Sequence, residues 1–185
     1  MIKEDQWFTY KKFYQDVVSE NPNYTRFVEV GVWAGASIIH LAKVLKKSER
    51  EFEILAVDVW DEKFVSFYDR PEIEKNGGIY NIYNTNLKEE GVRDVITDDR
   101  SISWDAPEKY EDGYFDFVYI DAGHNYEDVC KDIDAWMPKI KKGGILSGHD
   151  YWLDMQNPGV VKAVDEKIKD LNILPEQAVW WTKIS

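Results

Sequence analysis

The stretch Phe27-Val-Glu-Val-Gly-Val-Trp-Ala-Gly-Ala-Ser37 decides the fold of this chain. Its first four residues form a short apolar run with one acidic member, which is typical of a buried strand. Gly31 and Gly35 follow, and glycines permit a tight turn and a close approach of the backbone to a ligand. Apolar residues then recur at helical spacing from Ala36 to Lys47. A strand, a glycine turn and a helix in this order predict the opening unit of an α/β fold.

The same alternation of apolar runs and helical patterns continues along the chain. Further strands are predicted at 52–57, 92–96, 115–120, 145–147 and 178–184, and further helices at 7–18, 126–137 and 159–171. This order favours a Rossmann-like, doubly wound, mostly parallel sheet of six to seven strands in a single domain spanning residues 1–185. Residues 1–24 form an N-terminal helical segment in this prediction. The irregular segment 59–91 is predicted to shape or cover a substrate pocket, because a loop of that length usually carries function.

Charge and composition narrow the possible partners. The chain has 185 residues, with 23 Lys and Arg against 35 Asp and Glu, so its net charge is −12. Negative charge of this size repels nucleic-acid phosphates and anionic membrane surfaces, so we expect neither as a partner and expect a small molecule instead. One cysteine, Cys130, precludes an intrachain disulfide. The N-terminal residues lack a secretory pattern and no apolar run approaches the ~18 residues of a membrane span, so a soluble cytoplasmic protein is expected.

The glycine motif and Asp58 together indicate a cofactor. The spacing of Gly31 and Gly35 is G-x-x-x-G, whereas dinucleotide sites use G-x-G-x-x-G. The missing middle glycine weakens a pyrophosphate site, and Glu29 suits a cationic ligand. Asp58 ends the second predicted strand, where a carboxylate can accept hydrogen bonds from ribose hydroxyls. The alternatives are a plain glycine turn and an aspartate that only caps a turn.

Acidic and histidine side chains follow the fourth and fifth predicted strands. Asp121, His149 and Asp150 are expected at one edge of the sheet, because neighbouring parallel strands end there. Two carboxylates and an imidazole can hold one divalent cation. Alternatively, the two aspartates cap the following segments and His149 packs as a neutral ring. His124, in a loop with Gly123, is a candidate general base, and its alternative is a surface or cap histidine.

In this order, the motifs resemble the class I S-adenosylmethionine-dependent methyltransferases. The nearest likeness is to small-molecule O-methyltransferases of the macrocin and cephalosporin-biosynthesis type. The resemblance is carried by V-E-V-G-x-x-x-G-x-S at 28–37, V-D-V-W at 57–60, D-R-S at 99–101, I-D-A-G-H-N-Y-E at 120–127, G-G-I-L-S-G-H-D-Y at 143–151 and P-G-V-x-x-A-V at 158–164.

The resemblance implies a role for each matching residue. S-adenosylmethionine would be bound by Glu29, Gly31, Gly35, Ser37, Asp58, Ser101 and Asp121. His124 and Asp121 would be catalytic, and Asp121, His149 and Asp150 would bind magnesium or manganese. The implied reaction is metal-assisted methylation of a hydroxyl on a polar small molecule, such as a sugar or catechol. Many relatives carry a carboxylate in place of His149, and the short tail predicts a reduced final β-hairpin.

Two other functions fit part of the sequence. An NAD-dependent oxidoreductase would explain Asp58, but it would not explain the missing middle glycine or the metal-type ligands. A non-catalytic module on the same fold would bind the cofactor without turning it over.

Overall fold

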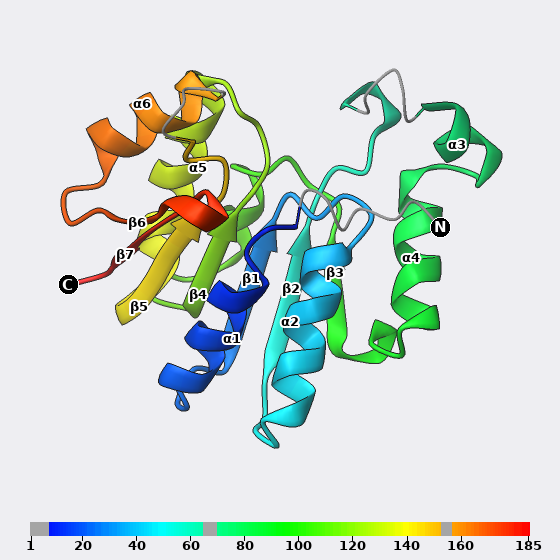
Figure 1. Ribbon diagram of the computed structural model, residues 1–185, viewed down its shortest axis with the longest axis horizontal. Coiled ribbons are helices and arrows are strands. Elements are labelled where there is room, and N and C mark those ends of the chain that lie inside the picture. The colour runs from blue at the N-terminus through cyan, green and yellow to red at the C-terminus, as the bar shows by residue number, and fades with distance from the viewer. Residues whose placement is uncertain (1–7, 65–69, 153–156) are drawn as a thin grey trace.

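A mostly parallel sheet forms the centre of the protein. The computed structural model describes residues 8–64, 70–152 and 157–185. Within them the strand order is β3-β2-β1-β4-β5-β7-β6, with β1 to β5 parallel and β7 antiparallel to both of its neighbours (Figure 1). The strands are β1 Arg26–Val30, β2 Glu53–Val57, β3 Ile96–Asp99, β4 Phe115–Ile120, β5 Ile140–Gly148, β6 Asn172–Leu174 and β7 Val179–Lys183. This confirms the predicted doubly wound α/β fold.

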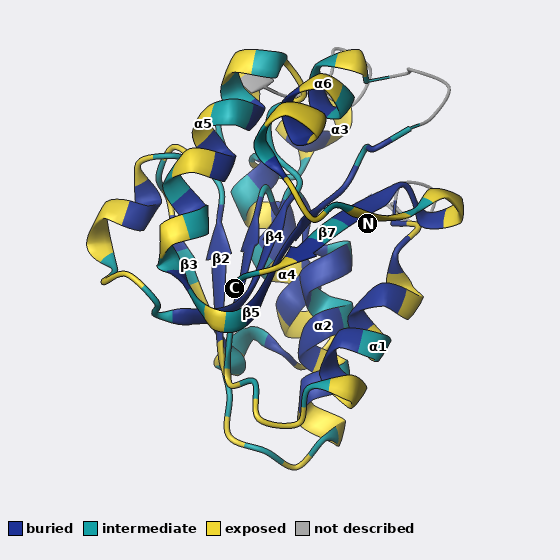
Figure 2. Cartoon of the chain, turned by 90° about the vertical axis from the view of Figure 1, so that its left-hand side faces the viewer, coloured by how far each residue is buried: buried dark blue, intermediate teal, exposed yellow. Residues whose placement is uncertain are grey.

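Helices cover both faces of the sheet. They are α1 Lys11–Glu20, α2 Ala36–Lys47, α3 Arg70–Lys75, α4 Ile79–Glu89, α5 Tyr126–Trp136 and α6 Pro158–Lys167. Helices α1, α2 and α4 pack on one face, and α5 and α6 pack on the other. Figure 2 shows the buried strands between these two layers, with the exposed residues on the outer sides of the helices. In the described part, none of the helices is long and apolar enough to cross a membrane.

Some predicted boundaries are wrong. The strand predicted at 92–96 starts only at Ile96. The Val92 amide donates to the Leu87 carbonyl in α4 at 3.0 Å, and Arg93–Val95 form a short 3-10 helix. Strand β5 starts five residues before its predicted start at 145. Strand β6, which the sequence did not indicate, pairs with β7, so the final hairpin is present but short. The first helix is predicted at 7–18, but α1 starts at Lys11 and ends at Glu20, and residues 8–10 are not helical; residue 7 lies outside the described residues.

Backbone hydrogen bonds beyond the strands hold the loops at the carboxyl edge together. The Gly31 amide donates to the Val57 carbonyl at 2.8 Å, and the Asp121 amide donates to the Val30 carbonyl at 2.7 Å. Gly31 has φ +86°, and a Cβ atom there would lie 2.0 Å from the Asp121 carbonyl oxygen. The glycine turn after β1 and the loop after β4 are therefore in direct contact, and glycine is the residue that permits it.

Candidate active site

Asp58 organises the glycine turn. Its Oδ2 accepts hydrogen bonds from the Val32 and Trp33 amides at 2.8 and 2.9 Å, and its Oδ1 accepts one from the Trp60 amide at 2.7 Å. An ionised carboxylate offers about four acceptor positions, so about one remains for a ligand. The predicted ribose-binding residue thus also holds the loop that would contact the same ligand.

Glu29 lies fully buried beneath this turn. Its Oε2 accepts a hydrogen bond from the Tyr14 hydroxyl at 2.8 Å, and its Oε1 accepts one from the Ser37 hydroxyl. Burial raises the pKa of Glu29 to about 8, although both hydroxyl donors oppose the shift. Without a ligand the carboxyl is therefore mostly neutral at pH 7. The structure brings Glu29 and Ser37, two of the residues predicted to bind the cofactor, into contact, and adds Tyr14 from α1.

Three side chains from the loops after β4 and β5 converge. Asp121, His124 and Asp150 each offer a potential ligand atom, and these atoms lie within 4.8 Å of one another. His124 Nε2 is 2.8 Å from Asp150 Oδ2. Asp150 has φ +62°, a left-handed conformation that non-glycine residues rarely adopt and that often marks functional sites. The converging trio contains His124, whereas the sequence analysis grouped His149 with the two aspartates.

His149 lies behind the same carboxylates. Its ring is buried, with Nε2 at 3.0 Å from the Thr9 hydroxyl oxygen and Nδ1 at 3.5 Å from Asp150 Oδ1 and 3.8 Å from Asp121 Oδ1. Burial by itself would raise the pKa of Asp150, but hydrogen bonds from His124 and His149 outweigh it and lower that pKa. Burial raises the pKa of Asp121, and the charge of His149 opposes the rise.

Ser101 lies at the carboxyl end of β3, beyond β2. Its hydroxyl donates to Asp99 Oδ1 at 2.5 Å and accepts from Lys109 Nζ at 2.7 Å. Lys109 also pairs with Asp99, at 2.6 Å. The residue predicted to lie near the adenine is therefore at the expected edge of the sheet, within a charged network.

Comparisons with known proteins agree with this geometry. A family model described as a methyltransferase domain matches residues 28–151, which is more than half of the chain. The chain belongs to this methyltransferase family. It has the Rossmann-like fold of S-adenosylmethionine-binding methyltransferases, and the family does not support the dehydrogenase alternative.

Individual relatives are distant. The uncharacterized protein y4gI of Sinorhizobium fredii (strain NBRC 101917 / NGR234) is 26% identical over 126 residues, which are 68% of this methyltransferase and 13% of that protein. The structure of the O-methyltransferase NovP has a TM-score of 0.71 at 20% identity, covering 97% of this chain and 79% of NovP. The S-adenosylhomocysteine-bound methyltransferase PaMTH1 of Podospora anserina has a TM-score of 0.66 at 15% identity, covering 95% and 77%. At these identities the two structures establish the fold.

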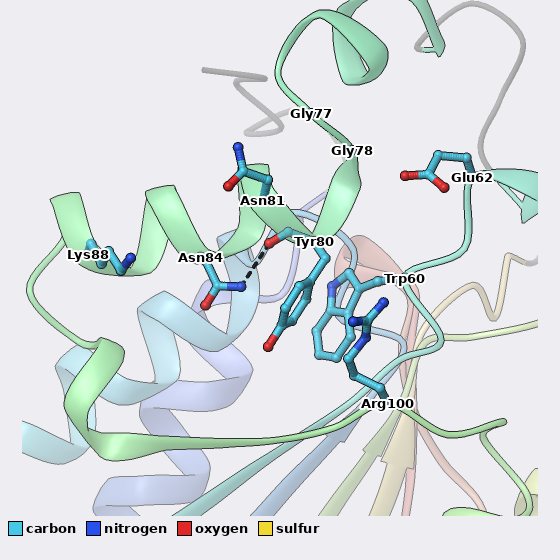
Figure 3. Close-up of a pocket in the computed structure, with 9 residues that line it drawn as sticks. All are labelled: Trp60, Glu62, Gly77, Gly78, Tyr80, Asn81, Asn84, Lys88 and Arg100. Carbon is cyan, nitrogen blue, oxygen red and sulfur yellow. Dashed lines mark hydrogen bonds between the residues drawn. The ribbon is translucent and has the colours of Figure 1, made fainter.

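A cavity of about 430 Å³ opens within the segment predicted to shape a substrate pocket. It is lined by Trp60, Glu62, Gly77, Gly78, Tyr80, Asn81, Asn84, Lys88 and Arg100. Figure 3 shows the Trp60 and Tyr80 rings side by side, with Arg100 next to them. The ring centroids are 5.1 Å apart, and the Arg100 guanidinium lies 4.4 Å from the Tyr80 ring centroid. Aromatic faces, amides and charges therefore line this cavity of the methyltransferase.

Two residues that the sequence motifs did not indicate contact the converging trio. Trp152 Nε1 donates to Asp150 Oδ1 at 2.9 Å. The Tyr10 hydroxyl donates to Asp121 Oδ2 at 2.9 Å, and the Tyr10 ring stacks on Tyr119 with centroids 4.5 Å apart. In the sequence, Tyr10 is only one aromatic member of a helical pattern. Nothing local indicates a contact with a residue 111 positions away.

Proposed function

We propose that this methyltransferase uses S-adenosylmethionine to methylate a hydroxyl group of a polar small molecule, as the macrocin and cephalosporin-type enzymes that it resembles would suggest. The observation that carries the proposal is the convergence of Asp121, His124 and Asp150 at the edge where the glycine turn touches Asp121. Ligands of open α/β sheets bind at this carboxyl edge. A cofactor held by the turn would thus lie beside groups that can bind and deprotonate an acceptor.

S-adenosylmethionine, when bound, supplies the methyl group. Glu29, Ser37 and the two glycines would hold its methionine end, the free acceptor position of Asp58 its ribose, and Ser101 would lie near its adenine. A cationic group bound beside Glu29 would lower the pKa of its carboxyl, so that the carboxyl would release its proton to solvent and pair with the ligand as a carboxylate.

His124 is proposed as the group that removes the acceptor proton. Its side chain is 51% exposed, so an acceptor can reach it, and Asp150 holds Nε2 at 2.8 Å. The hydrogen bond that His124 donates to Asp150 raises the pKa of His124 and stabilises the imidazolium that results. Because Nε2–H donates to Asp150, the hydroxyl proton would pass to Nδ1, the other ring nitrogen. The oxygen would take the methyl group that S-adenosylmethionine supplies when bound, and the carbon–sulfur bond would break. Alignment of the reacting atoms would supply much of the rate.

The same residues also fit a divalent cation such as magnesium or manganese. Two carboxylates and one imidazole nitrogen, all within 4.8 Å, form a suitable donor set, with His149 Nδ1 as a further candidate. Such an ion lowers the pKa of a bound hydroxyl. A ring nitrogen of His124 that binds the ion cannot also accept the proton of the acceptor. The two roles are therefore alternatives, and experiment can separate them.

The decisive experiment combines binding with turnover. Calorimetry should show that S-adenosylhomocysteine binds and that NAD does not, and mass spectrometry should detect methylation within a panel of sugars, catechols and other polar hydroxyl compounds. Loss of turnover in EDTA, with recovery on addition of manganese, supports the cation. Full turnover in EDTA supports His124 as base. Absence of S-adenosylhomocysteine binding contradicts the proposal, and binding without turnover favours the non-catalytic alternative.

The cavity beside segment 59–91 is proposed to hold a part of the acceptor remote from the methylated oxygen. Its aromatic faces and amides suit a ring that bears hydroxyl groups. Arg100→Gln should then raise the KM for the acceptor, because a donor in the wall is weakened, and should leave S-adenosylhomocysteine affinity unchanged. Steady-state kinetics with the acceptor from the panel measures this effect. An unchanged KM contradicts a role for this wall.

A further inference from the structure

Two tyrosine hydroxyls from the N-terminal segment reach two carboxyl groups of the candidate site. Tyr10 directly precedes α1 and Tyr14 lies one turn later. The Tyr10 hydroxyl donates to Asp121 Oδ2 at 2.9 Å, and the Tyr14 hydroxyl donates to Glu29 Oε2 at 2.8 Å. Both tyrosines are buried, at 2% and 0% exposure, so bulk water cannot readily replace either donor. One helix thus supplies a donor to the ends of both β1 and β4.

Each hydroxyl restricts the orientation of its carboxyl group. Because Tyr10 engages Oδ2 of Asp121, the other oxygen, Oδ1, is the one that faces His149, at 3.8 Å. Without that donor the carboxyl could rotate about its last bond, since such terminal torsions are broad. Glu29 is held from both sides, by Tyr14 on Oε2 and by Ser37 on Oε1.

The segment that carries these tyrosines is itself anchored. The Thr9 hydroxyl donates to the Gln177 carbonyl at 2.9 Å, and the Phe13 amide donates to Gln177 Oε1 at 3.1 Å. The Tyr10 ring also stacks on Tyr119 at 4.5 Å between centroids. Tyr10 is therefore located by contacts with β4 and with the turn before β7, in addition to its bond to Asp121.

Tyr119 provides a contrast within the same aromatic layer. It is fully buried, yet its hydroxyl has no hydrogen-bond partner within the part of the chain that the structure describes. Burial in this layer does not by itself direct a hydroxyl onto a carboxyl group. The donors of Tyr10 and Tyr14 are specific contacts, and Tyr119→Phe offers a matched control because it removes a hydroxyl that bonds no described group.

We infer that α1 and the residue before it are part of the active site, with Tyr10 as the positioning residue for Asp121 and Tyr14 as the positioning residue for Glu29. The inference rests on the proposed function. Tyr10 acts at the end of the site proposed to bind the cation and acceptor. Tyr14 acts at the end proposed to bind the methionine part of the cofactor. Loss of the two hydroxyls should therefore have separable effects.

The test compares Tyr10→Phe, Tyr14→Phe and Tyr119→Phe in the full-length chain. S-adenosylhomocysteine affinity is measured by calorimetry, and Mn²⁺ affinity by electron paramagnetic resonance in protein saturated with S-adenosylhomocysteine. Tyr10→Phe should weaken Mn²⁺ binding about 10-fold, as for other residues that orient metal ligands, and leave S-adenosylhomocysteine binding unchanged. Tyr14→Phe should weaken S-adenosylhomocysteine binding roughly 5- to 10-fold and leave Mn²⁺ binding unchanged. Tyr119→Phe should change neither affinity.

Other outcomes overturn the inference. If each variant loses both affinities in proportion to its loss of thermal stability, the tyrosines serve packing alone. If neither affinity changes in Tyr10→Phe and Tyr14→Phe, they position nothing. A crystal structure of Tyr10→Phe with S-adenosylhomocysteine tests Tyr10 even if the wild-type protein binds no Mn²⁺: an Asp121 carboxyl in its wild-type orientation refutes the role. Failure of the proposed function is distinct, because the wild-type protein itself would then not bind S-adenosylhomocysteine.

Discussion

At the scale of single residues, Asp58 both holds the glycine turn in place and is proposed to bind the ribose of the cofactor. Asp58→Ala removes the acceptor of three backbone amides, those of Val32, Trp33 and Trp60. We expect S-adenosylhomocysteine affinity to fall by about 1.5–3 kcal/mol, because hydrogen bonds to a charged group are lost. Calorimetry measures the loss. Asp61→Ala is the control, since in the described part of the chain the Asp61 carboxylate accepts from the Lys63 amide and pairs with its ammonium group. An equal loss in that variant would contradict a specific role for Asp58.

Because burial raises the pKa of Glu29, the free energy of unfolding should depend on pH. Its pKa is about 8 in the folded protein, above its ordinary value of 4.5. The folded state therefore binds the proton more tightly than the unfolded state. The resulting stability is complete below about pH 4.5 and is lost as the pH rises to about 8. The glutamine of Glu29→Gln cannot ionise, so the stability of this variant should not fall over that pH range for this reason.

Urea unfolding of the wild-type protein and of Glu29→Gln at a series of pH values tests the prediction. The free energy of unfolding of the variant, relative to the wild type, should rise by about 2–4 kcal/mol between pH 5 and pH 9. Any fixed cost of fitting the amide between Tyr14 and Ser37 is the same at every pH and cancels in this difference. Parallel pH profiles for the two proteins would show that Glu29 is ionised in the folded state.

At the scale of elements, the turn between β1 and α2 packs so closely on the loop after β4 that there is no room for a side chain at Gly31. Gly31→Ala places a Cβ atom 2.0 Å from the Asp121 carbonyl oxygen and also strains a φ of +86°. Gly143→Ala has a similar φ, +83°, but its Cβ atom meets nothing within 4 Å. We expect the free energy of unfolding to fall by about 1–2 kcal/mol in Gly143→Ala and by about 2 kcal/mol more in Gly31→Ala. Equal losses in urea unfolding would contradict the close contact.

The sequence predicts the bounds of a helix or strand well where turn-forming residues such as glycine directly precede it. The observed bounds of α2 and β4 match the prediction, because a glycine turn precedes α2 and Asp112-Gly113 precedes β4. Strand β6 has three residues, two of them exposed, so no apolar pattern marks it. The strand predicted at 92–96 is wrong over most of its length, because Val92 bonds back to α4 and Arg93–Val95 form a short 3-10 helix.

The candidate site was predictable only in part, because some of its contacts join residues far apart in the sequence. Asp121 and Asp150 could be placed at one edge because parallel strands end together. Which histidine joins them depends on the positive φ of Asp150 and on the contact between His149 and Thr9, residues 140 positions apart. Pairing of Tyr10 with Asp121 is equally long-range. Spacing along the chain carries no information about such contacts.

At the scale of the whole molecule, net charge dominates the long-range electrostatics. A charge of −12 on one chain repels itself, which destabilises the compact state. Raising NaCl from about 0.01 M to about 0.15 M shortens the screening length from about 30 Å to about 8 Å, so Tm should rise by a few degrees. Thermal unfolding followed by circular dichroism measures the change, with KCl as the control for specific sodium binding. A fall in Tm would show that ion pairs outweigh the repulsion.

The bond between Thr9 and Gln177 joins residues 168 positions apart. Translation delivers the N-terminal end first, so Tyr10 emerges from the ribosome long before the residue that anchors its segment has been synthesised. Until Gln177 has emerged, the nascent chain carries an aromatic helix that lacks part of its docking surface. A product of premature termination before that residue would contain every predicted catalytic side chain and still lack an anchored α1. Chaperone binding to the exposed aromatic face would then be strongest on such stalled chains.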